Sequence, residues 1–504
     1  MKKIISCTLL AALISLNGCS EDSAEKTRYD MEKLVHTAGK VAERISIQPN
    51  LATSADSLEL QAAHRDVLDF YFNHRADPVV AKDDIILGEM ARMAIRAQVE
   101  LAKFYANEQK ADSVLAAYRR IGREIPADPE DVAGATMALA LTFRAVSLFD
   151  SSIYFYDKLL AEYYPPTDSL QRVNTDIISI PIDKMKISRA IADTAMFEIF
   201  TRDALDYYGR LKSEFPNSLL ARTATIYTGR VYAITQQWDE ALDQLNQIKD
   251  STGIIDIQAL VLKANIYNGP LKDEKKSIEL YQEILARDPD SSIIGATLLR
   301  LGAALCSQEQ FEEGRRVLVD LKEAFTRYPF LTSKAQLYYA QSFEAQNRWD
   351  RALSEFQWLM ENHPYTEEAF RAALHIPEHF VRENDQKLAD IWYDRAIDFF
   401  NRAIINQQGR PVVIAAYTFL SDTYRRTEQW PEAMKTLDQI YSLTPTSRIG
   451  AKALYNAARV AYLELGDSTL SQSYLDRLYK EFGTADSAAI NEEEEADINL
   501  EEIQ

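Results

Sequence analysis

Residues 334–364 read KAQLYYAQSFEAQNRWDRALSEFQWLMENHP, and the spacing within this stretch decides the fold. Its small and large apolar residues recur three or four positions apart, at Ala340, Phe343, Ala352, Phe356 and Leu359. That period is typical of helices, and Pro364 ends the second one, because a proline in a helix interior removes a hydrogen bond and clashes with the preceding turn. The stretch therefore predicts two helices joined by a short turn.

The same pattern recurs from about residue 95 to the end of the chain. Three copies illustrate it: Gly229, Tyr232, Ala241 and Leu245; Ser421, Tyr424, Ala433, Leu437, Ile440 and Pro445; and last Tyr462, Ser471, Leu475 and Leu478. These spacings resemble the tetratricopeptide repeat, a helix–turn–helix unit in which small residues lie where helices touch. The resemblance implies an all-α fold, a right-handed α-solenoid of about ten helix pairs with a concave inner surface.

Departures from this period divide the chain into parts. The predicted parts are a signal peptide at 1–18, a lipidated tether with a helical N-terminal cap at 19–94, the first part of the array at 95–364, its second part at 365–485, and a disordered acidic tail at 486–504. We expect an insertion at 166–184 and an irregular repeat at 365–410, because neither stretch follows the repeat.

The N-terminus has the pattern of a lipoprotein signal. Two lysines precede a short apolar run that ends in LNGC at residues 16–19. A charged start and an apolar segment too short to span a bilayer predict a cleaved secretory signal. The ending resembles the lipobox of bacterial lipoproteins, which implies that Cys19 carries acyl chains such as palmitate. Each methylene contributes about 0.8 kcal/mol to membrane binding, so several chains anchor a protein durably. Because Ser20 replaces the aspartate associated with inner-membrane retention, the resemblance favours the outer membrane.

The composition favours helices and an acidic surface. The 504 residues include only 16 glycines and 16 prolines, and the formal net charge of −20 disfavours binding to nucleic acid. Seven acidic residues lie in the run 492–502, which predicts a solvated tail. Cys7 leaves with the signal and Cys19 is expected to carry lipid, so Cys306 has no partner for an intrachain disulfide and is interpreted as a half-buried packing residue.

One string has the spacing of a catalytic motif. The residues from His375 to His379 read HIPEH, the H-x-x-E-H order of inverted zinc peptidases, in which two imidazoles hold zinc and a glutamate activates water. Pro377 would disturb the helix that this geometry requires. We therefore favour a polar helix boundary without a metal, and a zinc peptidase remains an alternative that metal analysis would test. The sequence has no phosphate loop, dinucleotide turn or nucleophile elbow, so we expect neither enzymatic activity nor a cofactor.

The tetratricopeptide resemblance also implies a binding surface, because ligands of this family usually lie along the first helices of the pairs. That register places seven residues on the concave face: Lys103, Arg144, Arg189, Arg230, Gln341, Arg425 and Arg426. Such a basic stripe predicts an acidic peptide segment or a carboxylate terminus as ligand, with ion pairing between neighbouring repeats as the alternative. The lysine and asparagine pair of chaperone-binding repeats is missing, which disfavours chaperone tails.

Four junctions between repeats share one design, FPNS at 215–218, DPDS at 288–291, HPYT at 363–366 and TPTS at 444–447. The proline ends one helix, and the Ser or Thr is expected to cap the next.

These repeats resemble those of the lipoprotein in the outer-membrane β-barrel assembly machine and of periplasmic Tol-Pal-associated proteins. The resemblance implies a lipid-anchored, periplasm-facing scaffold that binds envelope proteins without catalysis, possible roles being outer-membrane assembly or envelope coordination. A SusD-type glycan-capturing lipoprotein is the alternative, disfavoured by the five tryptophans and few glycines.

Overall fold

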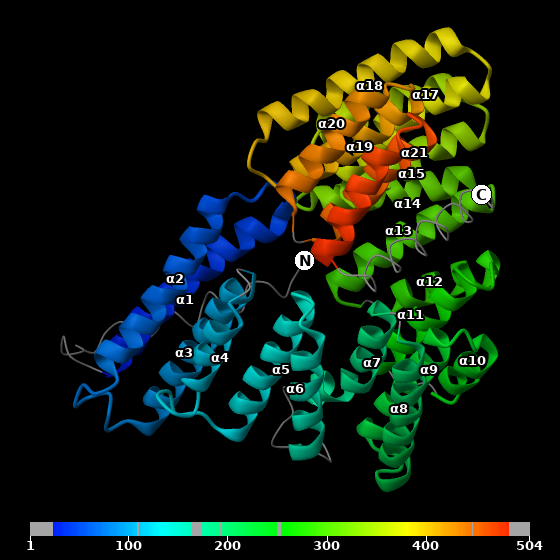
Figure 1. Ribbon diagram of the computed structural model, residues 1–504. Helices are drawn as coiled ribbons and strands as arrows, with labels where there is room; N and C mark the ends of the chain where they lie inside the picture. The colour runs from blue at the N-terminus through cyan, green and yellow to red at the C-terminus, as the bar shows by residue number, and fades with distance from the viewer. Residues whose placement is uncertain are drawn as a thin grey trace, which may run out of the picture. The chain divides into compact units, whose positions relative to one another are not determined.

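The computed structural model describes residues 24–107, 110–163, 174–191, 193–248, 254–287, 289–445 and 447–482. Within these ranges the regular elements are helices, and the predicted all-α class is confirmed (Figure 1). The predicted signal peptide, Cys19 and the predicted acidic tail at 486–504 lie outside the described residues.

The helices follow one another with short connections. They are α1 (Ala24–Ile47), η1 (Pro49–Leu51), α2 (Ser54–His74), α3 (Asp84–Asn107), α4 (Ala111–Arg119), α5 (Pro129–Ala145), α6 (Phe149–Glu162), α7 (Asn174–Ala190), α8 (Thr194–Glu214), α9 (Leu219–Ile234), α10 (Trp238–Asn246), α11 (Ile254–Asn268), α12 (Glu274–Ala286), α13 (Ser291–Ser307), α14 (Phe311–Ala324), α15 (Pro329–Ala345), α16 (Trp349–Asn362), α17 (Glu367–Arg382), α18 (Gln386–Asn406), α19 (Val412–Arg426), α20 (Trp430–Leu443) and α21 (Arg448–Leu463). A last helix covers residues 468–482.

From α8 onward the helices stack as neighbours in chain order. Each contacts the next, and first helices of adjacent pairs also contact each other, as α13 does with α15, α15 with α17 and α17 with α19. This is the arrangement of a solenoid, in which every pair buries its apolar face only against the pairs beside it.

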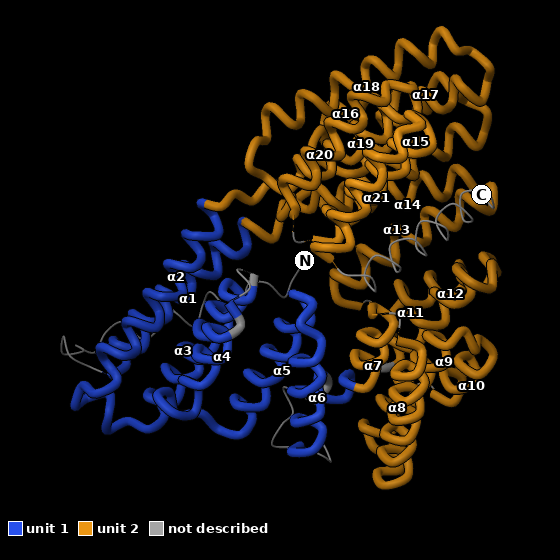
Figure 2. Tube along the Cα trace, viewed as in Figure 1, with its two compact units in different colours: residues 1–44, 55–180 blue, residues 45–54, 181–504 orange. Residues whose placement is uncertain are grey.

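The chain divides into two compact units, residues 1–44 with 55–180 and residues 45–54 with 181–504 (Figure 2). In the first unit α1, α2 and α3 share a core that includes the fully buried Met31, Tyr71 and Met90. In the second unit, small cores follow one another along the stack. The segment 45–54 belongs to this unit, where the Asn50 side chain donates to the Tyr365 carbonyl over 2.6 Å.

The residues that define the repeat are buried as predicted. In α15 and α16 the relative exposure of Ala340, Phe343, Ala352, Phe356 and Leu359 is 5% or less. Large side chains fill the space between pairs, and small residues let the two helices of a pair approach.

The turns inside the pairs share one backbone conformation. A single residue with positive φ follows the first helix in seven of them, at Ser147, Gln236, Lys272, Glu309, Asn347, Asn384 and Glu428. In the last pair this residue is Gly466. The turn of this pair is one residue longer, because its small buried residues, Ala458 and Ser471, are thirteen positions apart, whereas the corresponding residues of the preceding pair, Ser421 and Ala433, are twelve positions apart. The assignment of Tyr462 to the buried aromatic position is therefore wrong. Tyr462 is 60% exposed, and Ala458 takes the small buried position at 2%.

Two stretches that depart from the repeat pattern are helical where they are described. Residues 174–184 of the predicted insertion lie in α7, a helix that continues through Pro181. Residues 367–406 form the pair α17 and α18, and α18 is long, with 21 residues against 14 in α16. The predicted start of the array, near residue 95, falls inside α3, which starts at Asp84.

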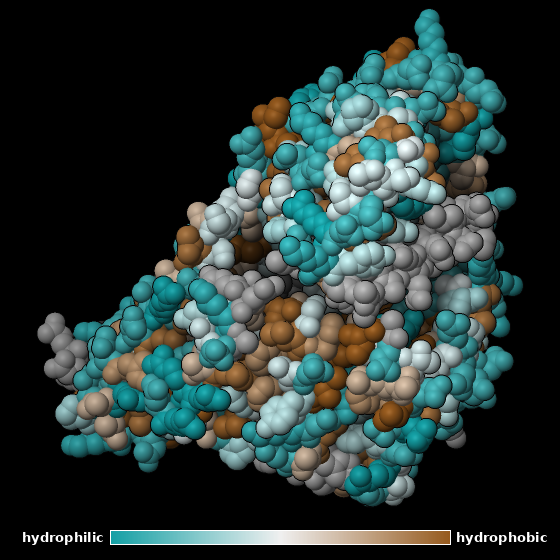
Figure 3. All heavy atoms as spheres, viewed as in Figure 1, coloured by the Kyte–Doolittle hydropathy of each residue, from teal (hydrophilic) through white to brown (hydrophobic). Residues whose placement is uncertain are grey.

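Hydrophilic side chains cover most of the face shown in Figure 3, with hydrophobic ones interspersed. Among the described residues, no helix has the length and apolar character needed to cross a membrane.

Candidate functional site

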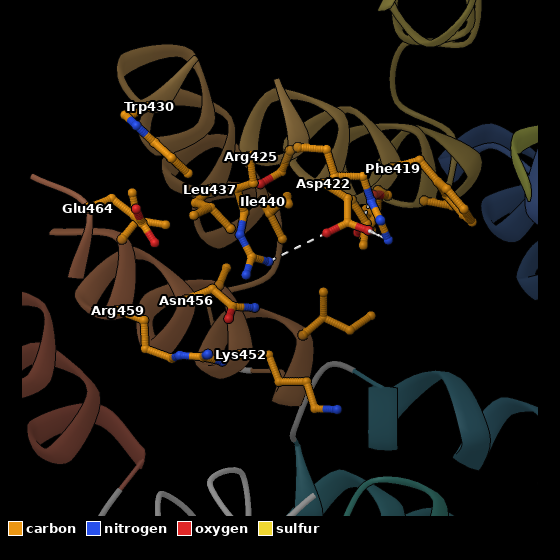
Figure 4. A pocket seen from close by; sticks show the side chains of 18 of the residues that line it. Phe419, Asp422, Arg425, Trp430, Leu437, Ile440, Lys452, Asn456, Arg459 and Glu464 are labelled. Atoms are coloured by element: carbon orange, nitrogen blue, oxygen red, sulfur yellow. Dashed lines mark hydrogen bonds and ion pairs between the residues drawn. The ribbon is translucent and has the colours of Figure 1, made fainter. Parts of the chain in front are cut away.

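A groove of about 1000 Å³ lies along α19 and α21, two successive first helices in the second unit (Figure 4). We call it the α19–α21 groove. Its apolar lining comes from α19, α20 and α21 and includes Ile414, Phe419, Trp430, Leu437, Ile440, Ile449 and Leu463. The groove opens along these helices because their small residues, such as Ala415 and Ala453, leave room between the larger side chains.

Charged side chains lie among these apolar ones. Four cations line the groove, namely Arg425, Arg426, Lys452 and Arg459, against three anions, Glu367, Asp422 and Glu464. Asp422 is within 3.5 Å of Arg425 and 3.7 Å of Arg426, so one carboxylate is shared by two guanidinium groups. The lining of the groove therefore has more cations than anions, whereas the whole protein has a net charge of −20.

Asn456 occupies the middle of the groove, on α21. Figure 4 shows Arg425 reaching from α19 towards it, with Lys452 and Arg459 on the same helix as Asn456. The Oδ1 atom of Asn456 is buried and has no hydrogen-bond partner among the described residues. A buried acceptor without a donor costs free energy, and a bound peptide N–H would relieve that cost.

The seven residues predicted for the concave face all lie on first helices. These helices are α3, α5, α7, α9, α15 and α19. The structure brings Arg425 and Arg426 together in the groove and leaves the other five outside it. Arg426 also contacts Glu378 of α17 at 3.0 Å, which is the inter-repeat ion pairing weighed as the alternative.

The five remaining residues have separate surroundings. Lys103 pairs with Glu100 of its own helix at 2.6 Å, and the Arg230 guanidinium lies over the Tyr227 ring, 4.8 Å from its centroid. Arg189 and Gln341 are exposed, and Arg144 is half-buried. Lys103 and Arg144 belong to the first compact unit and Arg189, Arg230 and Gln341 to the second, and for these five residues the basic stripe stays a prediction.

Lys452, Asn456 and Arg459 were missed because the last repeat was aligned on Tyr462. Aligning Ala458 with Ser421 instead places Lys452 at the position of Ala415 and Arg459 at that of Asp422, all of which line the groove. Gly466, in the longer turn, is the sequence signal that would have corrected this register.

A second polar cluster joins α15 to α17. The two oxygens of Glu344 meet His375 Nε2 at 2.6 Å, His379 Nδ1 at 3.3 Å and the Arg382 guanidinium at 2.9 Å. The indole of Trp349 stacks on the His379 ring, with centroids 3.4 Å apart and planes 5° from parallel. Burial raises the pKa of Glu344, but the hydrogen bonds from His375 and His379 and the charge of Arg382 outweigh it and hold that pKa below its ordinary value.

This cluster explains the H-x-x-E-H string. Pro377 lies inside α17, which continues from Glu367 to Arg382, so the interpretation of this string as a helix boundary is wrong. Both histidines face the same carboxylate across the pair, whereas Glu378 points to Arg426 instead of towards them. In the described part of the chain, no group of three or more His, Cys, Asp and Glu side chains has an arrangement that could hold a metal ion. The two histidines therefore act as an inter-repeat contact.

Cys306 has the surroundings of a packing residue. It is a free thiol of intermediate exposure, and burial raises its pKa despite the nearby charge of Arg315. A raised pKa disfavours the thiolate, which is the nucleophilic form.

The family model described as tetratricopeptide repeat matches residues 258–291 and 334–364, which correspond to α11–α12 and α15–α16. The chain contains tetratricopeptide repeats. Solved structures similar to it include yeast Tom70, at 13% identity over 94% of this chain and 97% of that chain with a TM-score of 0.38. The quorum sensor NprR from B. thuringiensis is similar at 13% identity over 70% and 99%, with a TM-score of 0.34. A Rap protein complexed with competence and sporulation factor is similar at 11% identity over 72% and 99%, with a TM-score of 0.32. The search of curated proteins found no match.

Proposed function

We propose that this tetratricopeptide protein is a non-catalytic scaffold, anchored by lipid on Cys19 to the outer membrane and facing the periplasm, that binds envelope proteins. The α19–α21 groove carries the binding part of the proposal, because it combines an apolar floor with several cations on the first helices. The lipobox-like sequence at residues 16–19 supports the anchor and the location.

The groove fits a peptide segment that presents both aliphatic and carboxylate side chains. Trp430, Leu437 and Ile440 offer apolar surface, and Arg425 and Arg459 offer planar guanidinium groups that can bind a carboxylate with two hydrogen bonds. A volume of about 1000 Å³ lies at the upper end of the range for small-ligand pockets and accommodates a few residues of an extended chain.

Site-specific photocrosslinking in cells tests this function on the full-length chain. A photoreactive amino acid is placed at Arg425, in the groove, and in a second variant at Lys435, an exposed residue of α20 outside it. We expect the Arg425 position to capture a discrete envelope protein that the Lys435 position does not. Adding Lys452→Glu and Arg459→Glu should reduce capture by about tenfold or more, because each charged hydrogen bond contributes about 1.5–3 kcal/mol. Equal capture from both positions, or none from Arg425, would contradict the proposal.

A further inference from the structure

The chain itself contains a segment whose chemistry matches the α19–α21 groove. The run 492–502 reads EEEEADINLEE, with seven acidic residues, and Ile498, Leu500 and Ile503 add aliphatic side chains among or beside the acids. The groove holds four cations, Arg425, Arg426, Lys452 and Arg459, among apolar side chains, against the three carboxylates of Glu367, Asp422 and Glu464. Its cations and apolar side chains are complementary to the acidic and aliphatic side chains of this run.

The last described helix ends close enough to the groove for this segment to reach it. Tyr441, near the end of α20, donates to Glu481, so the end of helix 468–482 lies beside the end of α20. A short turn leads from there to the start of α21, where Ile449 and Lys452 line the groove. Nine residues, 483–491, separate that helix from Glu492 and span at most about 30 Å when extended. Packed helix axes are about 8–10 Å apart, so this length exceeds the width of a helix pair.

We propose that residues 492–502 of this chain bind in its own α19–α21 groove and compete there with the acidic segments of partners. The inference rests on the proposed function, since it assigns the ligand class of the same groove. A partner that binds in the groove must therefore displace a tethered competitor. Tethering a segment to its site gives an effective concentration on the order of millimolar, so a segment that binds in trans with a dissociation constant of about 0.1 mM occupies its own groove about nine-tenths of the time.

A disulfide proximity experiment tests the contact in the full-length chain. Cys306→Ser removes the free thiol, and Glu495→Cys is combined either with Ile449→Cys, in the groove, or with Lys435→Cys, on α20 outside it. Neither pair removes a groove cation. We expect the Ile449 pair to form an intramolecular disulfide under mild oxidation at least tenfold faster than the Lys435 pair, independently of protein concentration. Similar rates for the two pairs would overturn the proposal.

A competition experiment tests whether the acidic side chains of the tail bind the cations of the groove. The probe is a labelled peptide with the sequence AINEEEEADINLEEIQ, residues 489–504, and its binding is measured by fluorescence anisotropy. We expect it to bind the full chain carrying Glu492→Gln, Glu493→Gln, Glu494→Gln and Glu495→Gln about tenfold more tightly than the unaltered chain, because the tethered competitor is weakened. Arg425→Glu with Arg459→Glu should abolish binding to either. Equal affinities of the peptide for the four-glutamine variant and the unaltered chain, or no binding of the peptide to either, would overturn the proposal.

The scaffold function and the binding of the tail in the groove can be disproved independently of each other. If the tail peptide does not bind but the Arg425 position still captures an envelope protein, the tail proposal is wrong and the scaffold function stands. If the tail binds in the groove but no envelope protein is captured even from the four-glutamine variant, the scaffold function is wrong.

Discussion

Gly302 and Gly314 show how closely the two helices of a pair approach. A Cβ atom at Gly314 would lie 2.5 Å from Cys306 Sγ and 2.9 Å from the Gly302 carbonyl oxygen. Neighbouring backbone cannot move aside as a flexible side chain can, so glycine here lets α13 and α14 pack.

Gly314→Ala should therefore destabilise the protein by about 1–3 kcal/mol, the usual cost of overpacking a core. Gly209→Ala is the matched control, because Gly209 lies in α8 with open space around its Cβ position and alanine is the better helix former. We expect that variant to be as stable as the unaltered protein or up to about 1 kcal/mol more stable. Chemical unfolding followed by circular dichroism measures the unfolding free energy of both variants. Equal losses of stability would show that the close approach of α13 and α14 is not the cause of the destabilisation.

Glu344 is the residue whose charge links two repeats. Its pKa is held below the ordinary value by His375, His379 and Arg382, so its contribution to stability is present at pH values above the ordinary glutamate range and is lost as the pH falls through the lowered pKa.

Glu344→Gln should cost about 1–2 kcal/mol of unfolding free energy at neutral pH, and the difference from the unaltered protein should shrink as the pH falls below the ordinary glutamate range. Glu279→Gln, which changes an exposed carboxylate of α12, should show no such difference. Unfolding curves across pH check this, and a difference that stays constant at low pH would contradict the assigned role.

At the scale of the element, helix starts are set by capping side chains at the junctions. Three of the four predicted Ser or Thr caps are confirmed, since Ser218 accepts from the Ala221 N–H, Thr366 from Ala369 and Ser447 from Gly450. At the fourth junction the cap is Asp290 rather than Ser291, because Asp290 accepts from the N–H groups of Ser292 and Ile293. A carboxylate one position earlier competes successfully for the same donors.

Ser218→Ala should lower stability by about 1 kcal/mol, because the start of α9 loses its side-chain acceptor. Ser213→Ala is the control in the preceding helix, where the exposed hydroxyl donates only to the Arg210 carbonyl and alanine favours the helix. Thermal unfolding compares the two variants, and an equal fall in melting temperature would argue against a capping role for Ser218.

At the scale of the whole molecule, the proposed anchor and the proposed binding array are separate. The first compact unit has its own core in α1 to α3, and the α19–α21 groove belongs to the second unit. The residues that form this core and line this groove all follow residue 23, and Cys19 lies outside the described residues.

Cys19→Ser should therefore move the protein from the membrane fraction to the soluble fraction and leave its fold unchanged. Fractionation of cells measures the first effect, and circular dichroism with the melting temperature of the purified variant measures the second. A variant that stays with the membrane would contradict the lipid anchor, and one that fails to fold would contradict the separation of anchor and array.

Sequence spacing alone predicts the all-α class, the pairing of helices and the buried repeat residues of α15 and α16, although it misplaces the buried position of the last pair at Tyr462. These follow from local spacing, because small and large apolar residues at helical intervals specify which face each helix buries. Which polar side chains meet cannot be read from this spacing and follows from the packing of the helices. Glu344 lies more than thirty positions from His379, and Arg425 about as far from Arg459, so the contact of the first two and the shared groove of the second two depend on how successive pairs stack. The turn at Gly466 is one residue longer than in the other pairs, so spacing counted back across it misplaces the positions of α21 by one residue, whereas the packing of α21 shows that Lys452, Asn456 and Arg459 line the groove.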